Sequence, residues 1–242
     1  MFAAPINPIF KRHLVLTFCL SATLLLPAAS GQTVTFADDT FDNLDWSLQV
    51  RGDAPFFSAS GQQVGSGGNP DAFRRVNVSL NTNGGTSGGF VTAFHWLDSA
   101  SYDPTVSGPL ESIDFSINHL RIATPPAHNG QGFGLALKQN GYLYRASIFF
   151  TQTLSGWQNT QDSSITPGDI RGNAGAPDID FSGSEIGFGF YTAHSSPNNR
   201  TNDMLTVGYD NYQVDLHVVP EPTTVCLMGL GAVALLRRRR VR

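Results

Sequence analysis

Short runs in which apolar and polar residues alternate occupy most of the chain between residues 32 and 218. The runs 76–80, 112–117, 133–137 and 186–190 each place apolar residues at every second position, and the run 205–218 does so with one change of phase at Asp210-Asn211. A period of two is that of a β-strand with one buried face. Helix-length stretches rich in Ala, Leu, Glu and Lys are absent from this region. The pattern therefore predicts an all-β protein.

The turn residues are consistent with this prediction. Asn140-Gly141 separates two apolar runs and predicts a hairpin with a type I′ turn, because both positions need positive φ. The Gly- and Ser-rich segment 58–70 and the polar segment 158–184 are expected to be loops. The glycines within 186–190 indicate a close backbone approach or a bend.

The spacing of these runs predicts the architecture. About ten strands, separated by turns, without an internal repeat and without a linker to a second domain, favour a two-sheet β-sandwich that closes as a jelly roll. We expect residues 32–218 to form this sandwich as a single domain, long enough to build its own core.

The C-terminal segment has a different pattern, with three parts in a fixed order. Pro220-Glu221-Pro222 is followed by an apolar run at 225–236 and by the cluster Arg237, Arg238, Arg239 and Arg240. The prolines hold the chain extended and accessible, the apolar run partitions into hydrocarbon, and the arginines keep its end on the cytoplasmic side.

Together the three parts resemble the PEP-CTERM sorting signal of Gram-negative bacteria, which we place at residues 219–242. The resemblance implies recognition by an exosortase, a membrane-embedded cysteine protease, and processing near Pro220-Glu221-Pro222. It also implies transient anchoring in the inner membrane, followed by the cell surface, the extracellular matrix or secretion. The apolar segment from Thr223 to Leu236 has 14 residues, shorter than the usual span of roughly 17–25. We expect a short transmembrane helix with snorkelling arginines; the alternative is a short buried helix with a solvated basic tail.

The N-terminus carries a second export signal. Lys11 and Arg12 precede an apolar stretch at 14–26 and a small-residue segment at 27–32. This layout predicts a secretory signal peptide over residues 1–31, with signal peptidase cleaving before Gln32.

Cysteine usage and charge narrow the function classes. Cys19 and Cys226 both lie in the targeting segments, so the exported part has no thiol for a disulfide, a nucleophile or a metal site. All 19 acids lie between residues 38 and 221, where only 8 of the 15 basic residues occur, so this part has a net charge of −11 (8 minus 19). An acidic surface of this kind argues against a nucleic-acid partner.

Three short stretches of the exported part resemble concanavalin-like or galactose-binding-like jelly rolls. They are 39–46, 67–70 and 209–214, the last directly before the sorting signal. The resemblance implies a jelly-roll sandwich, and many such domains bind glycans and hold a structural calcium ion.

Calcium is the most plausible inorganic partner, although no cofactor is required by the sequence. Asp38, Asp39 and Asp42 could meet Asp210 if the two terminal strands pair, and hard carboxylate oxygens suit the ion. The simpler alternative is that these acids only cap turns.

For a glycan ligand, exopolysaccharide included, the candidate stacking residues are Trp157, Tyr142 and Tyr144. One strand carries Phe90, Thr92, Phe94 and Trp96 on a single face. We expect Trp46 and Trp96 to belong to the core.

No catalytic constellation is recognisable. Glu111 and Asp114 are three positions apart and so lie on opposite faces of a strand, unlike the paired acids of jelly-roll glycosidases. The histidines lack metal spacing, and no nucleophile elbow is present. The sequence thus predicts a non-enzymatic exported protein with a structural or glycan-binding role; the alternative is a secreted glycan-active enzyme with an unrecognised site.

Overall fold

The computed structural model describes residues 31–54, 56–82, 88–123, 130–150, 156–197 and 203–219. Gly31–Val219 forms one compact unit. The predicted signal peptide and the predicted transmembrane segment lie outside the described residues. Among the described residues, no helix has the length and apolar character needed to cross a membrane.

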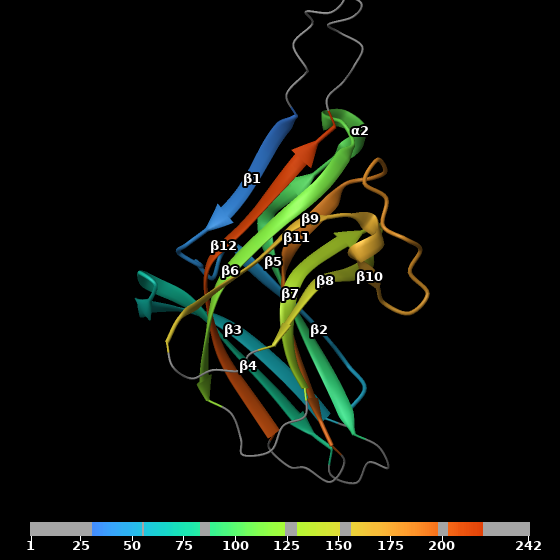
Figure 1. Cartoon of the computed structure of the whole chain (residues 1–242). Coiled ribbons are helices and arrows are strands. Elements are labelled where there is room, and N and C mark those ends of the chain that lie inside the picture. The colour runs from blue at the N-terminus through green and yellow to red at the C-terminus, as the bar shows by residue number, and fades with distance from the viewer. Residues whose placement is uncertain are drawn as a thin grey trace, which may run out of the picture. The chain divides into compact units, whose positions relative to one another are not determined.

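One sheet, which we call sheet A, has β12 as a central strand (Figure 1). Two strands share one side of β12: β4 pairs with its first half, from Asp203 to Tyr209, and β1 pairs with its second half, up to Val218. All pairings are antiparallel, and β3 and β9 lie at the edges. The strands are β1 (Gln32–Asp38), β3 (Phe56–Gly68), β4 (Asp71–Asn81), β6 (Leu110–Ala123), β9 (Gln158–Ile165) and β12 (Asp203–Val218).

The second sheet, sheet B, has the strand order β10-β8-β7-β11-β5-β2 and is also antiparallel. Short helical turns lie at Pro104–Ser107 (α2) and Pro167–Asp169 (η2). The strands are β2 (Trp46–Gly52), β5 (Gly89–Tyr102), β7 (Gly130–Gln139), β8 (Tyr142–Phe150), β10 (Arg171–Gly172) and β11 (Ile186–Ser196).

The core lies between the two sheets. It takes the inward residues of the alternating runs, such as Val76 and Val78 from sheet A and Phe188 and Phe190 from sheet B, all fully buried. Trp46 packs edge-on against Phe190, with ring centroids 5.4 Å apart. The predicted all-β, two-sheet sandwich is confirmed.

Two segments expected to be loops contain strands. The segment 58–70 lies mostly within β3, and the segment 158–184 contains β9, η2 and β10. β3 and β9 are the edge strands of sheet A, and their burial patterns show few buried positions. A strand that buries little on either face does not require alternating apolar residues, so these two segments carry no period-two pattern.

The hairpin prediction is confirmed. β7 and β8 are joined at Asn140 and Gly141, whose φ angles are 52° and 80°. Both values are positive, as a type I′ turn requires.

Candidate functional site

The outer face of sheet B has a trough along its two central strands. On β7 the outward positions include Gly132, Gly134 and Ala136, and on β11 they include Gly189 and Ala193. A Cβ at Gly134 would collide with the Ser147 carbonyl oxygen, and one at Gly189 would collide with the His95 carbonyl oxygen. The glycines are therefore required by close backbone approach, as the sequence predicted for β11, and they also leave the middle of the face low.

Larger outward side chains from β5 and β8 rise on both sides of this trough. Between them lies a recess of about 360 Å³, within the size range of small-molecule sites. Its described lining comes from β5, β7, β8 and β11, and comprises Phe90, Thr92, Gln131, Gly132, Arg145, Ile148, Tyr191, Ala193, His194 and Ser195.

The recess combines exposed apolar walls with a buried aromatic floor. Phe90 is 45% exposed and Ile148 is 68% exposed, whereas Tyr191 is only 2% exposed. The Arg145 guanidinium lies over the Tyr191 ring, 5.8 Å from its centroid. Burial raises the pKa of Tyr191 to about 12, and the positive charge of Arg145 offsets part of that rise. Tyr191 is thus a neutral, apolar floor with a cation above it.

A second apolar cluster, separate from the core, continues from the recess along the same face. Phe94 and Trp96 stack with centroids 5.8 Å apart and planes inclined by 5°. They cluster with Ala136, Leu143 and Tyr191. The Lys138 ammonium lies 5.2 Å from the Trp96 ring centroid, so each end of the aromatic surface carries a cation.

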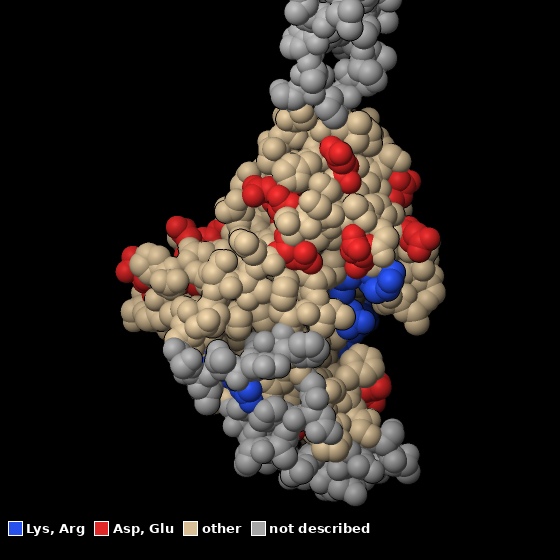
Figure 2. All heavy atoms as spheres, viewed as in Figure 1, with Lys and Arg blue, Asp and Glu red and all other residues tan. Residues whose placement is uncertain are grey.

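The charged side chains follow a simple distribution in the face shown by Figure 2. Several blue Lys and Arg side chains gather in a hollow beside β8, β10 and β2, and a separate blue patch lies lower on the same face, whereas red Asp and Glu side chains are spread over the rest of the surface. No Asp or Glu is among the described residues that line the recess. The described lining can therefore present positively charged, aromatic, aliphatic and amide groups to a ligand, but no carboxylate.

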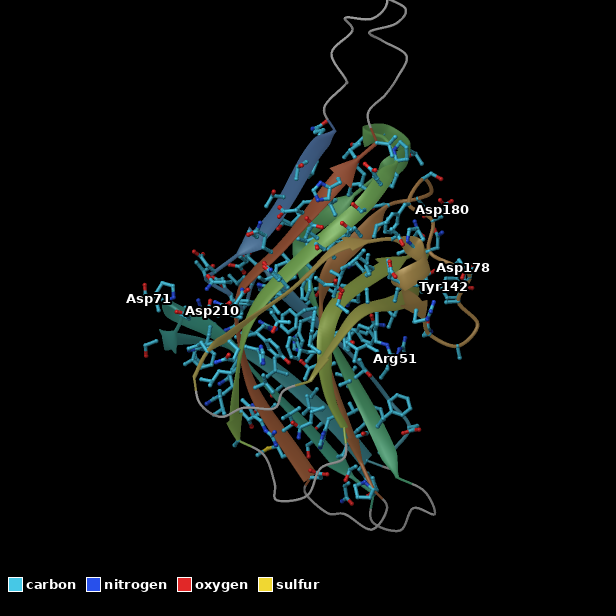
Figure 3. The ribbon with its side chains drawn as sticks, viewed as in Figure 1. Arg51, Asp71, Tyr142, Asp178, Asp180 and Asp210 are labelled. Carbon is cyan, nitrogen blue, oxygen red and sulfur yellow. The ribbon has the colours of Figure 1, made fainter. Side chains whose placement is uncertain are left out.

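The three predicted glycan-stacking residues are not brought together. Trp157 belongs to the sheet A side, where its Nε1–H donates to the Gly67 carbonyl oxygen at 3.0 Å and its ring packs edge-on against Phe73. Tyr144 is 2% exposed within the core, because it is an inward residue of β8, and so offers no ring face to solvent. Tyr142, at the start of β8, is 38% exposed and lies on the side of the domain that carries Arg51 (Figure 3).

The tryptophans predicted to be core residues divide between two places. Trp46 is 5% exposed and lies in the core. Trp96 is equally well buried, at 3% exposure, but it belongs to the outer cluster on sheet B. On β5 the aromatic phase of Phe90, Phe94 and Trp96 points outward, and the inward phase contains Val91 and Ala93. An excess of aromatic residues on the outward phase was the signal for this site.

Of the residues predicted to bind calcium, Asp38 and Asp39 are near enough to Asp210 for their charges to act on it, and the carboxylates of Asp38, Asp42 and Asp210 accept hydrogen bonds from the protein. β1 pairs with β12 as expected, with Asp38 opposite Tyr212. Asp38 accepts hydrogen bonds from the Trp46 Nε1–H at 2.5 Å and from the Thr40 N–H at 2.8 Å. Asp210 accepts from the Asn69 and Asn211 N–H groups.

The charges at this junction repel one another. Burial raises the pKa of Asp38, but the hydrogen bonds from Trp46 and Thr40 outweigh it and hold that pKa below its usual value. Burial raises the pKa of Asp210, and the negative charges of Asp39 and Asp38 raise it further.

The fourth predicted calcium ligand, Asp42, accepts a hydrogen bond from the Leu44 N–H at 3.0 Å. In the part of the chain that the structure describes, no group of three or more His, Cys, Asp or Glu side chains is arranged to hold a metal ion, and the calcium site stays a prediction.

The two acids considered for catalysis lie on β6. Glu111 is exposed, whereas Asp114 accepts hydrogen bonds from the Ser164 N–H at 2.7 Å and pairs with His217 Nε2 at 2.9 Å. Asp114 thus serves as a cross-strand partner on the outer face of sheet A, and the recess lies on the other sheet.

A protein-family model, the PEP-CTERM protein-sorting motif, matches residues 218–240. The match contains Pro220, Glu221 and Pro222 together with Arg237–Arg240, so the predicted sorting motif is confirmed, although it lies outside the described residues. The motif indicates export and sorting to the cell surface or extracellular space and implies processing by an exosortase. No curated protein matches the chain.

Several solved structures are similar to the chain. The family 11 carbohydrate-binding module from Clostridium thermocellum, in complex with a β-1,3-1,4-mixed-linked tetrasaccharide, has 16% identity and a TM-score of 0.44, over 80% of this chain and 99% of that chain. The CBM22-1 xylan-binding domain of Paenibacillus barcinonensis Xyn10C has 9% identity and a TM-score of 0.35, over 80% and 99%. Basic winged bean lectin with Tn-antigen has 10% identity and a TM-score of 0.29, over 76% and 99%.

Proposed function

We propose that this exported protein binds a polysaccharide in the recess on the outer face of sheet B and does not cleave it. The observation that carries the proposal is the lining of the recess. Phe90 and Ile148 present apolar surface to solvent on either side of a low floor. Sugars bind to such surfaces through their C–H faces, while nearby planar polar groups accept or donate hydrogen bonds to hydroxyls.

The same lining supports binding rather than hydrolysis. Glycosidases usually need two carboxyl groups on either side of the scissile bond, and the described lining contains neither Asp nor Glu. The sorting motif supports the choice of ligand class, because it directs the domain to the cell surface or extracellular space, where a polysaccharide is accessible.

Replacing the exposed ring tests the site. In full-length protein purified in detergent, Phe90→Ala should weaken polysaccharide binding about tenfold, because stacking on an aromatic ring is lost. Phe56→Ala is the matched control: Phe56 is 68% exposed but lies on β3 of sheet A. Binding would be measured by affinity electrophoresis and calorimetry against neutral and acidic glycans, with the glycans analysed afterwards for cleavage.

Equal losses for the two variants would place the glycan elsewhere. Binding to none of the glycans would contradict the function, and release of shorter oligosaccharides would contradict its non-enzymatic part.

A further inference from the structure

Basic residues are unevenly placed in this domain. Between residues 31 and 219 there are 18 acids and 8 basic residues, a net charge of −10 (8 minus 18). Four of the eight lie on strands of sheet B and share its outer face: Arg51, Lys138, Arg145 and Arg171.

The strand register places these cations around the recess. Arg51 on β2 is directly opposite Thr92, which lines the recess. Cross-strand partners share a face of the sheet, so Arg51 borders the recess from the β5 side. Arg145 borders it from the β8 side. Figure 3 shows Arg51 on the side of the domain opposite Asp71 and Asp210.

Arg171 adds a second positive charge beside Arg145. β10 pairs with β8 so that Arg171 and Arg145 are direct cross-strand partners. Like charges in this position repel and destabilise a sheet. No described carboxylate forms an ion pair with either residue.

The neighbours of the pair compensate it only in part. The Arg171 Nη1–H donates to the Gly168 carbonyl oxygen at 3.1 Å. The pKa of Asp169 is lowered first by hydrogen bonds from Thr166, and the charge of Arg171 contributes less. Arg145 lies over the Tyr191 ring. Two arginines on neighbouring strands, Arg171 exposed and Arg145 half-buried, therefore form no ion pair with a carboxylate of the described residues.

We propose that the polysaccharide held in this recess is acidic, with carboxylate-bearing sugars bound by Arg145 and Arg171 and with Arg51 on the other side. The proposal rests on the proposed glycan-binding function and adds the chemical class of the ligand. Guanidinium groups bind carboxylates through two parallel N–H···O bonds, which a neutral sugar cannot supply. The acidic remainder of the domain repels polyanions elsewhere, so the positive face also orients the ligand.

The test compares one sugar backbone with and without its charge. Full-length protein would be titrated with polygalacturonate and with its fully methyl-esterified form, and also with alginate, xylan and mixed-linkage β-glucan. We expect polygalacturonate or alginate to bind at least about tenfold more tightly than the esterified polymer and the neutral glycans, and the preference to shrink as NaCl is raised.

Variants locate the charge recognition. Arg171→Gln and Arg145→Gln should each lower affinity for the acidic polymer about tenfold and leave any weak binding of the esterified polymer unchanged. Arg75→Gln is the matched control, since it removes the same charge from β4 on sheet A. Arg171 is exposed on a two-residue strand, so its variant should melt at the wild-type temperature even if Arg145→Gln is less stable.

Each outcome separates the two proposals. Equal affinity for charged and esterified polymers, or equal losses for Arg171→Gln and Arg75→Gln, would overturn the acidic ligand and leave glycan binding intact. Binding to none of the glycans would overturn the proposed function itself. Equally tight binding of single-stranded DNA or polyglutamate would also overturn the acidic-sugar proposal, because the face would then recognise charge alone.

Discussion

The outer faces of the two sheets differ although their inner faces are alike. On sheet A, outward polar side chains bind one another across strands: Thr35 Oγ1 donates to Asp215 at 2.6 Å, and Thr206 Oγ1 donates to Asn77 at 2.9 Å. On sheet B, many outward side chains are small or aromatic, and the cations of Lys138 and Arg145 lie over aromatic rings. Polar side chains that bind one another have fewer groups left for a ligand, whereas a hollow face whose cations form no ion pair with a described carboxylate is suited to one.

The largest effect should come from the glycines that make the hollow. Gly189→Ala should lower the free energy of unfolding by about 3 kcal/mol, because its Cβ would collide with the His95 carbonyl oxygen. Gly65→Ala on β3 of sheet A has open space around the new Cβ and should change stability by less than about 0.5 kcal/mol. Urea denaturation of both variants measures the contrast; a small loss for Gly189→Ala would mean that the trough is not fixed by backbone contact.

A smaller effect is expected from filling the trough without disturbing the backbone. Ala193 lies between Gly132 and Thr92 across the strands, and Ala193→Leu should lower glycan affinity at least about tenfold by occupying the floor. Its thermal melt should stay close to that of wild type. Ser79→Leu, on an outward position of β4, adds comparable bulk to sheet A and should leave affinity unchanged. Wild-type affinity in Ala193→Leu would exclude this floor as the site.

The inner faces were predictable from sequence, and the outer faces were not. Alternation identifies inward residues because burial on one face is a local requirement of each strand. The edge strands β3 and β9 bury little, so they lack that signal. The recess depends on β7 and β11 lying between β8 and β5, an order fixed by long-range pairing rather than by any single segment.

Trp96 illustrates the limit. The alternation on β5 correctly predicts that Trp96 shares a face with Phe90 and Phe94, but the expectation that Trp96 belongs to the core is wrong, because it rests on aromatic residues usually facing inward. The inward positions of β5 include Ala93 and the buried His95, so they are less apolar than the outward positions.

The sorting motif could be predicted because the order of its parts along the chain is itself the signal.

The smallest effect belongs to sheet A. Burial raises the pKa of Asp114, but the hydrogen bonds from His217 and Ser164 outweigh it and keep that pKa below its usual value. This carboxylate therefore stabilises the fold above about pH 4, its unfolded pKa, and the contribution is lost as pH falls through the lower folded value. Because the pair is partly exposed, Asp114→Asn should cost less than about 1 kcal/mol at pH 7.

Denaturation of Asp114→Asn and wild type at a series of pH values would show the two curves converging in acid. Glycan affinity should be unaffected at neutral pH. A loss of affinity would mean that sheet A takes part in binding and that the contrast between the faces is wrong.

The position of β12 has a mechanical consequence. This strand ends at Val218, and its last half is hydrogen-bonded to β1 on one side and to β6 on the other. Inter-strand hydrogen bonds run perpendicular to the strands, so a pull on the chain at Val219 along β12 loads both ladders in shear at once. A force applied at the end of β12 is therefore opposed by two rows of hydrogen bonds together, so the domain is expected to resist unfolding from its C-terminal end.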